Sequence, residues 1–146
     1  MRLVTSTESR TGTQIDAVGI NRRSVFNLSE ARAVLPVVSR LTKQYSERVQ
    51  NLIKEIEGLK AESARADVLE SEAGRLIQEW QSKIQKLGGL PKGMWIVDFD
   101  SGDGYFCWKF PEKSIQHWHH YRDGFTKRVV LPETAHDSLN RTLIPT

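Results

Sequence analysis

Length, composition and charge predict one soluble domain and exclude several classes of protein. With 146 residues, 38% hydrophobic and 27% charged, the chain has the size and composition of a single globular domain. Its 21 Lys and Arg are spread along the sequence against 18 Asp and Glu, which is not the clustered positive charge of most nucleic-acid-binding proteins. No window approaches the roughly 18 apolar residues of a membrane span, so we expect no membrane partner. The single cysteine excludes an internal disulfide and favours a reducing, cytoplasmic location.

The two ends of the chain differ from its middle. Residues 1–24 are rich in Ser, Thr, Gly and Arg and have no apolar period, so we expect a flexible leader there. The composition after Leu131 is similar, and residues 132–146 are predicted to form a flexible tail. A single domain is therefore predicted over residues 25–131.

The first ordered element is predicted to be a long helix. Asn27 and Glu30 have the spacing of a capping box, in which each side chain bonds the other residue's backbone amide. Apolar residues then recur at steps of three and four: Ala31, Leu35, Val38, Tyr45, Val49, Leu52, Ile56 and Leu59, with Leu41 covering the seam beside Thr42. This heptad-like period is typical of a coiled-coil helix. Because Pro36 removes one backbone hydrogen bond, we expect a kink or a break near Leu35.

A second helix of the same period follows. Asp67 with Glu70 is a second capping-box pattern, and Gly88-Gly89 followed by Pro91 is a stop signal. Its apolar seam consists of Leu69, Ala73, Leu76, Trp80, Ile84 and Leu87. Two helices of matching period joined by a short link are predicted to form an antiparallel hairpin.

From Met94 onward the apolar period changes to two. Three runs rich in aromatic and β-branched residues, at 94–99, 105–110 and 114–119, are separated by turn signals at 100–104 and 111–114. The predicted fold class is therefore α+β, with a long antiparallel helical hairpin packed on a three-stranded antiparallel β-meander.

Turns of five and four residues would fix the register of this meander. Asp98, Phe106 and His119 then form one cross-strand row, with Ile96, Trp108 and His117 in the next row of the same face. Cys107 and Trp118 lie on the opposite face, and both faces come out apolar. One face would cover the hairpin, and the other would need a second subunit, which predicts a homodimer. Alternatively, residues 129–131 fold back to cover it.

The strands carry the candidate site residues. His117 and His119, two positions apart on a strand, point to the same side and have a spacing that can chelate a divalent transition metal such as zinc. Asp98 and His119 are candidates for a general base and the group that orients it, although Phe106 lies between them in the row. On a central strand, Cys107 is expected to be a small buried hydrophobe and not a nucleophile.

A basic aromatic surface is a third possibility for the strands. Four cations accompany the aromatic residues and would suit single-stranded nucleic acid: Lys109, Arg122, Lys127 and Arg128. There is no phosphate-binding loop and no dinucleotide fingerprint.

Residues 26–131, about three quarters of the chain, resemble the bacterial family catalogued as domain of unknown function 2203. The resemblance rests on Phe26-Asn27-Leu28-x-Glu30-Ala31 before Leu35-Pro36, then Ile96-Val97-Asp98-Phe99, Cys107-Trp108-Lys109, Trp118-His119 and Gly124-Phe125. Asn27 departs from the threonine that is common in such proteins, and His120 from an acidic residue. The resemblance supports the domain boundaries and draws attention to Trp118-His119, but it implies no particular chemistry.

Taken together, the sequence favours a non-enzymatic protein-interaction or assembly module that self-associates through the hairpin or the sheet and needs no cofactor. The alternative is a metal- or small-ligand-binding domain, with or without enzymatic activity, centred on His117 and His119. The ligand-binding candidates for that alternative are Asp98, Trp108, Trp118 and His119. Nucleic-acid binding is the weaker alternative.

Overall fold

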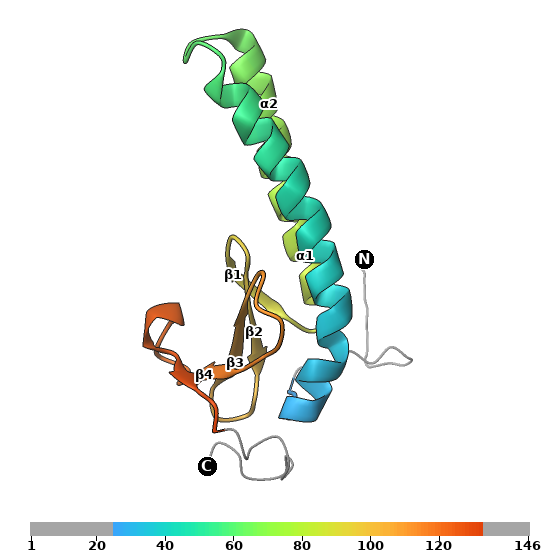
Figure 1. Cartoon of the computed structure of the whole chain (residues 1–146), viewed down its shortest axis with the longest axis vertical. Helices are drawn as coiled ribbons and strands as arrows, with labels where there is room; N and C mark the ends of the chain where they lie inside the picture. The colour runs from blue at the N-terminus through green and yellow to red at the C-terminus, as the bar shows by residue number, and fades with distance from the viewer. Residues whose placement is uncertain (1–24, 133–146) are drawn as a thin grey trace, which may run out of the picture.

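The computed structural model describes residues 25–132 and has an α+β fold (Figure 1). Two helices precede a five-stranded antiparallel sheet whose strands follow one another in chain order. The predicted leader at 1–24 and all of the predicted tail except Pro132 lie outside the described residues. The elements are α1 (Leu28–Glu57), α2 (Ala64–Lys86), β1 (Leu90–Gly93), β2 (Ile96–Asp100), β3 (Tyr105–Lys109), β4 (His117–His119), the 3-10 turn η1 (Phe125–Lys127) and β5 (Val129–Val130).

Helix α1 begins with the predicted capping box and continues past its proline. The Asn27 side chain accepts a hydrogen bond from the Glu30 backbone N–H at 2.7 Å, and Glu30 accepts one from the Asn27 N–H at 2.9 Å. Of the kink or break expected near Leu35, the break does not occur, because α1 is continuous from Leu28 to Glu57 with Pro36 inside it. Leu35 and Val38, on either side of the proline, are both buried, so tertiary packing holds this part of the helix.

The N-cap of helix α2 lies four residues before the predicted one. Ser63, and not Asp67, is the N-cap, since its hydroxyl accepts a hydrogen bond from the Ala66 backbone N–H at 2.9 Å. Asp67 lies in the first turn, where its negative charge interacts favourably with the helix dipole. The predicted glycine stop is correct: the helix ends at Lys86, and Gly88 follows with a φ of 95°.

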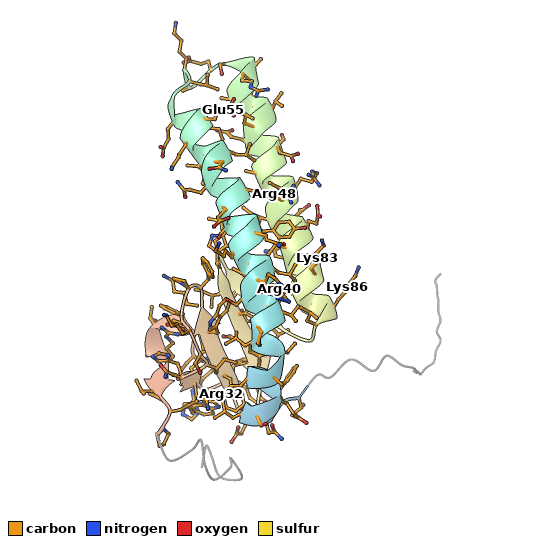
Figure 2. The ribbon with its side chains drawn as sticks, turned by 45° about the vertical axis from the view of Figure 1, so that its right-hand side comes forward. Arg32, Arg40, Arg48, Glu55, Lys83 and Lys86 are labelled. Atoms are coloured by element: carbon orange, nitrogen blue, oxygen red, sulfur yellow. The ribbon has the colours of Figure 1, made fainter. Side chains whose placement is uncertain are left out.

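The two helices pack side by side as the predicted antiparallel hairpin, which projects well beyond the sheet (Figure 1). In Figure 2, Arg32 lies at the end of α1 beside the sheet and Glu55 near the far end of the hairpin. The Arg32 guanidinium donates a hydrogen bond of 2.6 Å to the backbone carbonyl of Ile115, in the loop before β4. This contact ties the base of α1 to the sheet.

One polar residue occupies the apolar seam of the hairpin. The sequence pattern assigned this part of the seam to Leu41, but Thr42 is fully buried and Leu41 only partly. The Thr42 hydroxyl donates to the Val38 carbonyl at 2.7 Å and accepts the indole N–H of Trp80 at 2.9 Å. Thr42 therefore continues the heptad period without an unsatisfied polar group.

The register of the sheet differs by one residue from the predicted one. Asp98 lies opposite Cys107, and Cys107 opposite His117, while Tyr105 pairs with His119. The turn between β2 and β3 is one residue shorter than expected, because Asp100 belongs to β2 and pairs with Tyr105 instead of lying in the turn. Inside it the Asp100 carboxylate accepts the Gly102 N–H at 2.9 Å, and Gly102 has a φ of 96°, which glycine adopts readily.

This register makes the two faces of the sheet unlike each other. The face toward the helices carries Val97, Phe99, Phe106 and Trp108, which join the main core with Val38, Trp80 and Ile84. The opposite face carries Asp98, Cys107, His117 and His119. The predictions of two apolar faces and of Cys107 opposite the histidines are therefore wrong. The homodimer stays a prediction, but one without support from a second apolar face.

The sheet has five strands where three were predicted, because both of its edges are extended by short strands. Leu90–Gly93 pairs with β2, and Val129–Val130 pairs with β4. The Leu131 N–H also donates to the Gln116 carbonyl at 2.8 Å, so residues 129–131 fold back, but they extend the edge of the sheet beside β4, with Val129 and Val130 exposed, and do not cover its second face as the alternative expected. Neither α1 nor α2 is long and apolar enough to cross a membrane.

Because Thr42 and Trp80 form a buried hydrogen bond, replacing Thr42 should lower the stability of the protein, whereas replacing an exposed threonine should not. Replacing Thr42 by Val keeps the shape but leaves the Trp80 N–H without its acceptor, which costs about 1–3 kcal/mol of unfolding free energy. Chemical denaturation would measure this loss, with Thr126→Val at an exposed position as the control, expected to change stability by less than about 0.5 kcal/mol. Equal stability of the two variants would contradict the prediction.

Candidate functional site

Three buried residues with metal-ligating side chains meet on the face of the sheet away from the helices. Asp98 comes from β2, Cys107 from β3 and His119 from β4, three adjacent strands. Each is at most 2% exposed, and one ligating atom from each side chain lies within 4.8 Å of the other two. Carboxylate, thiolate and imidazole are the three side-chain types that bind zinc.

The hydrogen bonds of His119 fix which ring nitrogen carries the proton. Nδ1 lies 3.0 Å from the backbone carbonyl oxygen of His120. Because a carbonyl can only accept, Nδ1 must be the donor. Nε2 lies 3.1 Å from Oδ2 of Asp98. In the neutral ring this leaves the Nε2 lone pair facing a carboxylate oxygen, so a shared proton or a cation is needed between the two atoms.

Asp98 is incompletely satisfied for a buried carboxyl group. Oδ2 contacts His119, whereas Oδ1 is buried and has no hydrogen-bond partner among residues 25–132. A buried acceptor without a partner costs about 1–3 kcal/mol.

Cys107 is the third member of the cluster and is protonated in the absence of a metal. Its burial, and secondly the adjacent Asp98 carboxylate, raises the pKa of the Cys107 thiol to about 12. The charge of Arg128 and its hydrogen bond with the thiol act less strongly in the opposite direction. The Arg128 guanidinium is itself held by Glu112, with Nη1 at 3.1 Å from Oε1. A thiol with so high a pKa is not an activated nucleophile.

A pocket of about 300 Å³ opens beside Asp98 and His119. Its walls come from β1, from the polar face of the sheet and from the segment after β4, which in Figure 1 lies on the side of the sheet away from the helices. The remaining lining residues are Lys92, Ile96, Tyr105, Tyr121, Asp123, Gly124 and Phe125. A small molecule in this pocket can therefore reach Asp98 and His119, whereas Cys107 does not line it.

The aromatic residues around the pocket contact one another. The Tyr105 ring lies 5.5 Å from the His119 ring and 5.0 Å from the Tyr121 ring, centroid to centroid. The Tyr121 hydroxyl donates to Oδ1 of Asp100 at 2.6 Å, which raises the pKa of Tyr121 to about 12. Tyr121 is therefore un-ionised at neutral pH and forms a fixed wall of the pocket.

The structure brings together only some of the residues that the sequence singled out. Asp98 and His119 are in direct contact, contrary to the predicted intervening position of Phe106. His117 lies opposite Cys107, in the same cross-strand row as Cys107 and Asp98, and its Nδ1 is buried and unpartnered among the described residues, but it is not one of the three clustered ligands. Trp108 belongs to the core. Trp118, on the core-facing side, donates its indole N–H to Ser101 at 3.0 Å and does not line the pocket.

Cys107 and the pocket walls were not identified from the sequence. A signal for Cys107 was present in the turn at 100–104, where an aspartate two residues before a glycine favours a tight side-chain-capped turn. A turn of that length would have placed Cys107 opposite Asp98. The pocket residues come from β1 and from the segment after β4, and their convergence had no signal in the local sequence.

The raised pKa of Cys107 predicts an unreactive thiol in the folded, metal-free protein. At pH 8 only about one thiol in 10,000 is ionised when the pKa is about 12, so alkylation by iodoacetamide should be at least about 1,000-fold slower than for an ordinary cysteine. Mass spectrometry can follow the reaction, since Cys107 is the only cysteine, and the urea-unfolded protein is the control. Similar rates in the folded and unfolded states would contradict this prediction.

Comparison with known proteins identifies the family. The family described as uncharacterized conserved protein DUF2203 matches residues 24–131, which include all three clustered residues. No curated protein and no solved structure gives a significant match. Because the match covers well over half of the chain, the protein belongs to the DUF2203 family.

Proposed function

We propose that this protein is a metal-binding domain in which Asp98, Cys107 and His119 bind a divalent transition metal, with zinc as the preferred ion. The metal would lie at the base of the 300 Å³ pocket, where a small ligand can reach it. This proposal adopts the alternative function expected from the sequence, with Cys107 and Asp98 joining His119 as ligands.

The orientation of His119 is the observation that carries the proposal. In metal sites a ligating histidine usually donates its second ring N–H to a backbone carbonyl or a carboxylate, which fixes the tautomer. His119 does this through Nδ1 and the His120 carbonyl, and so directs the Nε2 lone pair at Asp98. A cation there would satisfy this lone pair together with the unpartnered oxygen of Asp98.

The spacing of the cluster also suits zinc. In a tetrahedral zinc site with bonds of about 2.0 to 2.3 Å, neighbouring ligand atoms lie roughly 3.4 Å apart. The Nε2 to Oδ2 distance of 3.1 Å is close to this value, and the largest separation in the cluster, at most 4.8 Å, requires only a small movement of a side chain. Three protein ligands are the number found in catalytic zinc sites, which keep one position for water or substrate.

A bound metal would supply Lewis acidity, polarising an oxygen of a ligand or lowering the pKa of a bound water. The residues of the chain have separate roles in such a site. Asp98, Cys107 and His119 would hold the ion, the His120 carbonyl orients His119, and Arg128, which is paired with Glu112, interacts with the Cys107 thiol. Burial of all three ligands excludes water from all but the pocket side.

Self-association and nucleic-acid binding remain predictions. Self-association would use the projecting part of the hairpin or the exposed edge of β5, where Val129 and Val130 are more than half exposed. Two of the four cations proposed for nucleic acid have partners on the protein instead, since Arg128 pairs with Glu112 and Lys109 lies 5.9 Å from the centre of the Phe125 ring.

Cobalt binding tests the proposed ligand set directly. Co²⁺ bound through a thiolate gives an intense sulfur-to-metal absorption band, which we expect in the wild type and not in Cys107→Ser. Asp98→Asn and His119→Gln should weaken zinc affinity by more than about 100-fold, beyond the 10- to 100-fold typical of residues that only support a ligand. Titration of the metal-free protein against a chromophoric chelator measures these affinities.

His117→Gln is the matched control, because His117 is on the same face and strand but outside the cluster. It should change zinc affinity by less than about tenfold. If His117→Gln abolished binding while Cys107→Ser retained it, the site would be the His117–His119 pair instead. Absence of zinc and cobalt binding to the wild type would refute the metal-binding function.

The affinity for zinc should increase with pH. Metal binding requires the Cys107 thiolate, and the thiol pKa of about 12 means that the proton is present at neutral pH and is released when the metal binds. We therefore expect the apparent association constant to rise at least about tenfold per pH unit from pH 6 to pH 8. Cys107→Ser should show a shallower dependence, and calorimetry in buffers of different ionisation enthalpy would count the released protons.

A further inference from the structure

Two residues of opposite charge, Lys92 and Asp123, line the pocket from different parts of the sheet. Lys92 is on β1, the first strand, and Asp123 follows β4, on the far side of β2 and β3. The Lys92 ammonium nevertheless reaches over the sheet, since it lies 5.5 Å from the centre of the Tyr105 ring on β3. Both residues line the same pocket, with Asp98 and His119 at its base.

Neither charge is neutralised by the part of the chain that the structure describes. Among residues 25–132, Lys92 forms no ion pair, and its ammonium group lies over the Tyr105 ring. The Asp123 carboxylate likewise forms no ion pair or side-chain hydrogen bond with these residues, although its backbone N–H donates to the His120 carbonyl at 3.0 Å. Lys92 and Asp123 therefore form no ion pair with each other, and both charges are available to a molecule in the pocket that they line.

The proposed metal centre would itself be electrically neutral. The charge of a divalent cation equals that of the Asp98 carboxylate and the Cys107 thiolate together, and His119 is a neutral ligand. The charges left for a ligand to balance are therefore Lys92 and Asp123. A ligand with one acidic and one basic group balances both, whereas a simple acid leaves Asp123 facing its own charge and a simple amine leaves Lys92 unpaired.

The rest of the pocket limits the size and character of the ligand. A volume of about 300 Å³ is at the small end of ligand sites. Ile96, Tyr105 and Phe125 provide apolar surface for a short carbon chain between the charged groups. The apolar wall thus favours an aliphatic spacer over a fully polar ligand.

We infer that the pocket binds a small zwitterion, an amino-carboxylic compound whose carboxylate lies toward the metal and Lys92 and whose ammonium group lies toward Asp123. This inference rests on the proposed metal site. It adds the chemical class of the ligand and assigns a specificity role to two residues that do not bind the metal.

Calorimetry on the full-length, zinc-loaded protein tests the inference with three probes of equal carbon number: β-alanine, propionate and propylamine. β-Alanine should bind at least about tenfold more tightly than either of the others. Lys92→Met should weaken both β-alanine and propionate, and Asp123→Asn should weaken β-alanine about tenfold without weakening propionate. Lys113→Met, at an exposed lysine outside this pocket, is the matched control and should leave all three affinities unchanged.

The outcomes separate the ligand class from the metal site. If the protein retains zinc but binds β-alanine no better than propionate, or not at all, the zwitterion inference is wrong and the metal-binding function stands. If the wild type binds no zinc, both fail. The zinc content after dialysis against β-alanine excludes simple removal of the metal by the probe, and circular dichroism verifies that each variant is folded.

Discussion

The packing of one face of the sheet against the base of the helical hairpin is the constraint on which the rest of the structure depends. Side chains alternate along a strand, so burying Val97, Phe99 and Trp108 against the helices forces the intervening residues to the other side. The intervening residues on β2 and β3 include Asp98 and Cys107. The position of the candidate site is therefore a direct consequence of how the core is filled.

The same packing explains how polar groups come to be so deeply buried. The sheet shields Asp98 and Cys107 on the helix side, and the segment from β4 to β5 covers part of the other side. Because water is excluded there, the Asp98 carboxylate oxygen without a hydrogen-bond partner lowers the stability of the fold, and burial also keeps the Cys107 thiol protonated. In the proposed metal site, a divalent ion would turn these unfavourable terms into coordination bonds.

The helices and the site differ in how far the sequence predicts them. The capping box at Asn27 and the heptad positions from Ala31 to Val49 depend on neighbours within one or two turns, so they could be recognised directly. The errors were small and local: Ser63 replaces Asp67 as a cap, and Thr42 takes a seam position through its hydrogen bond with Trp80. Asp98 and His119 were candidates from the sequence, but their partner Cys107 was assigned to the wrong face.

The sequence by itself determined two amphipathic helices, an aromatic antiparallel sheet and the concentration of Asp98, Cys107 and His119 in that sheet. Only the tertiary structure decided the register, and a shift of one residue changes every partner and every face. The strands gave no local preference between the two registers, because aromatic residues occupy both sets of alternating positions. Burial against the hairpin and the length of the turn after Asp100 selected one register, and that selection brought Cys107 to Asp98 and His119.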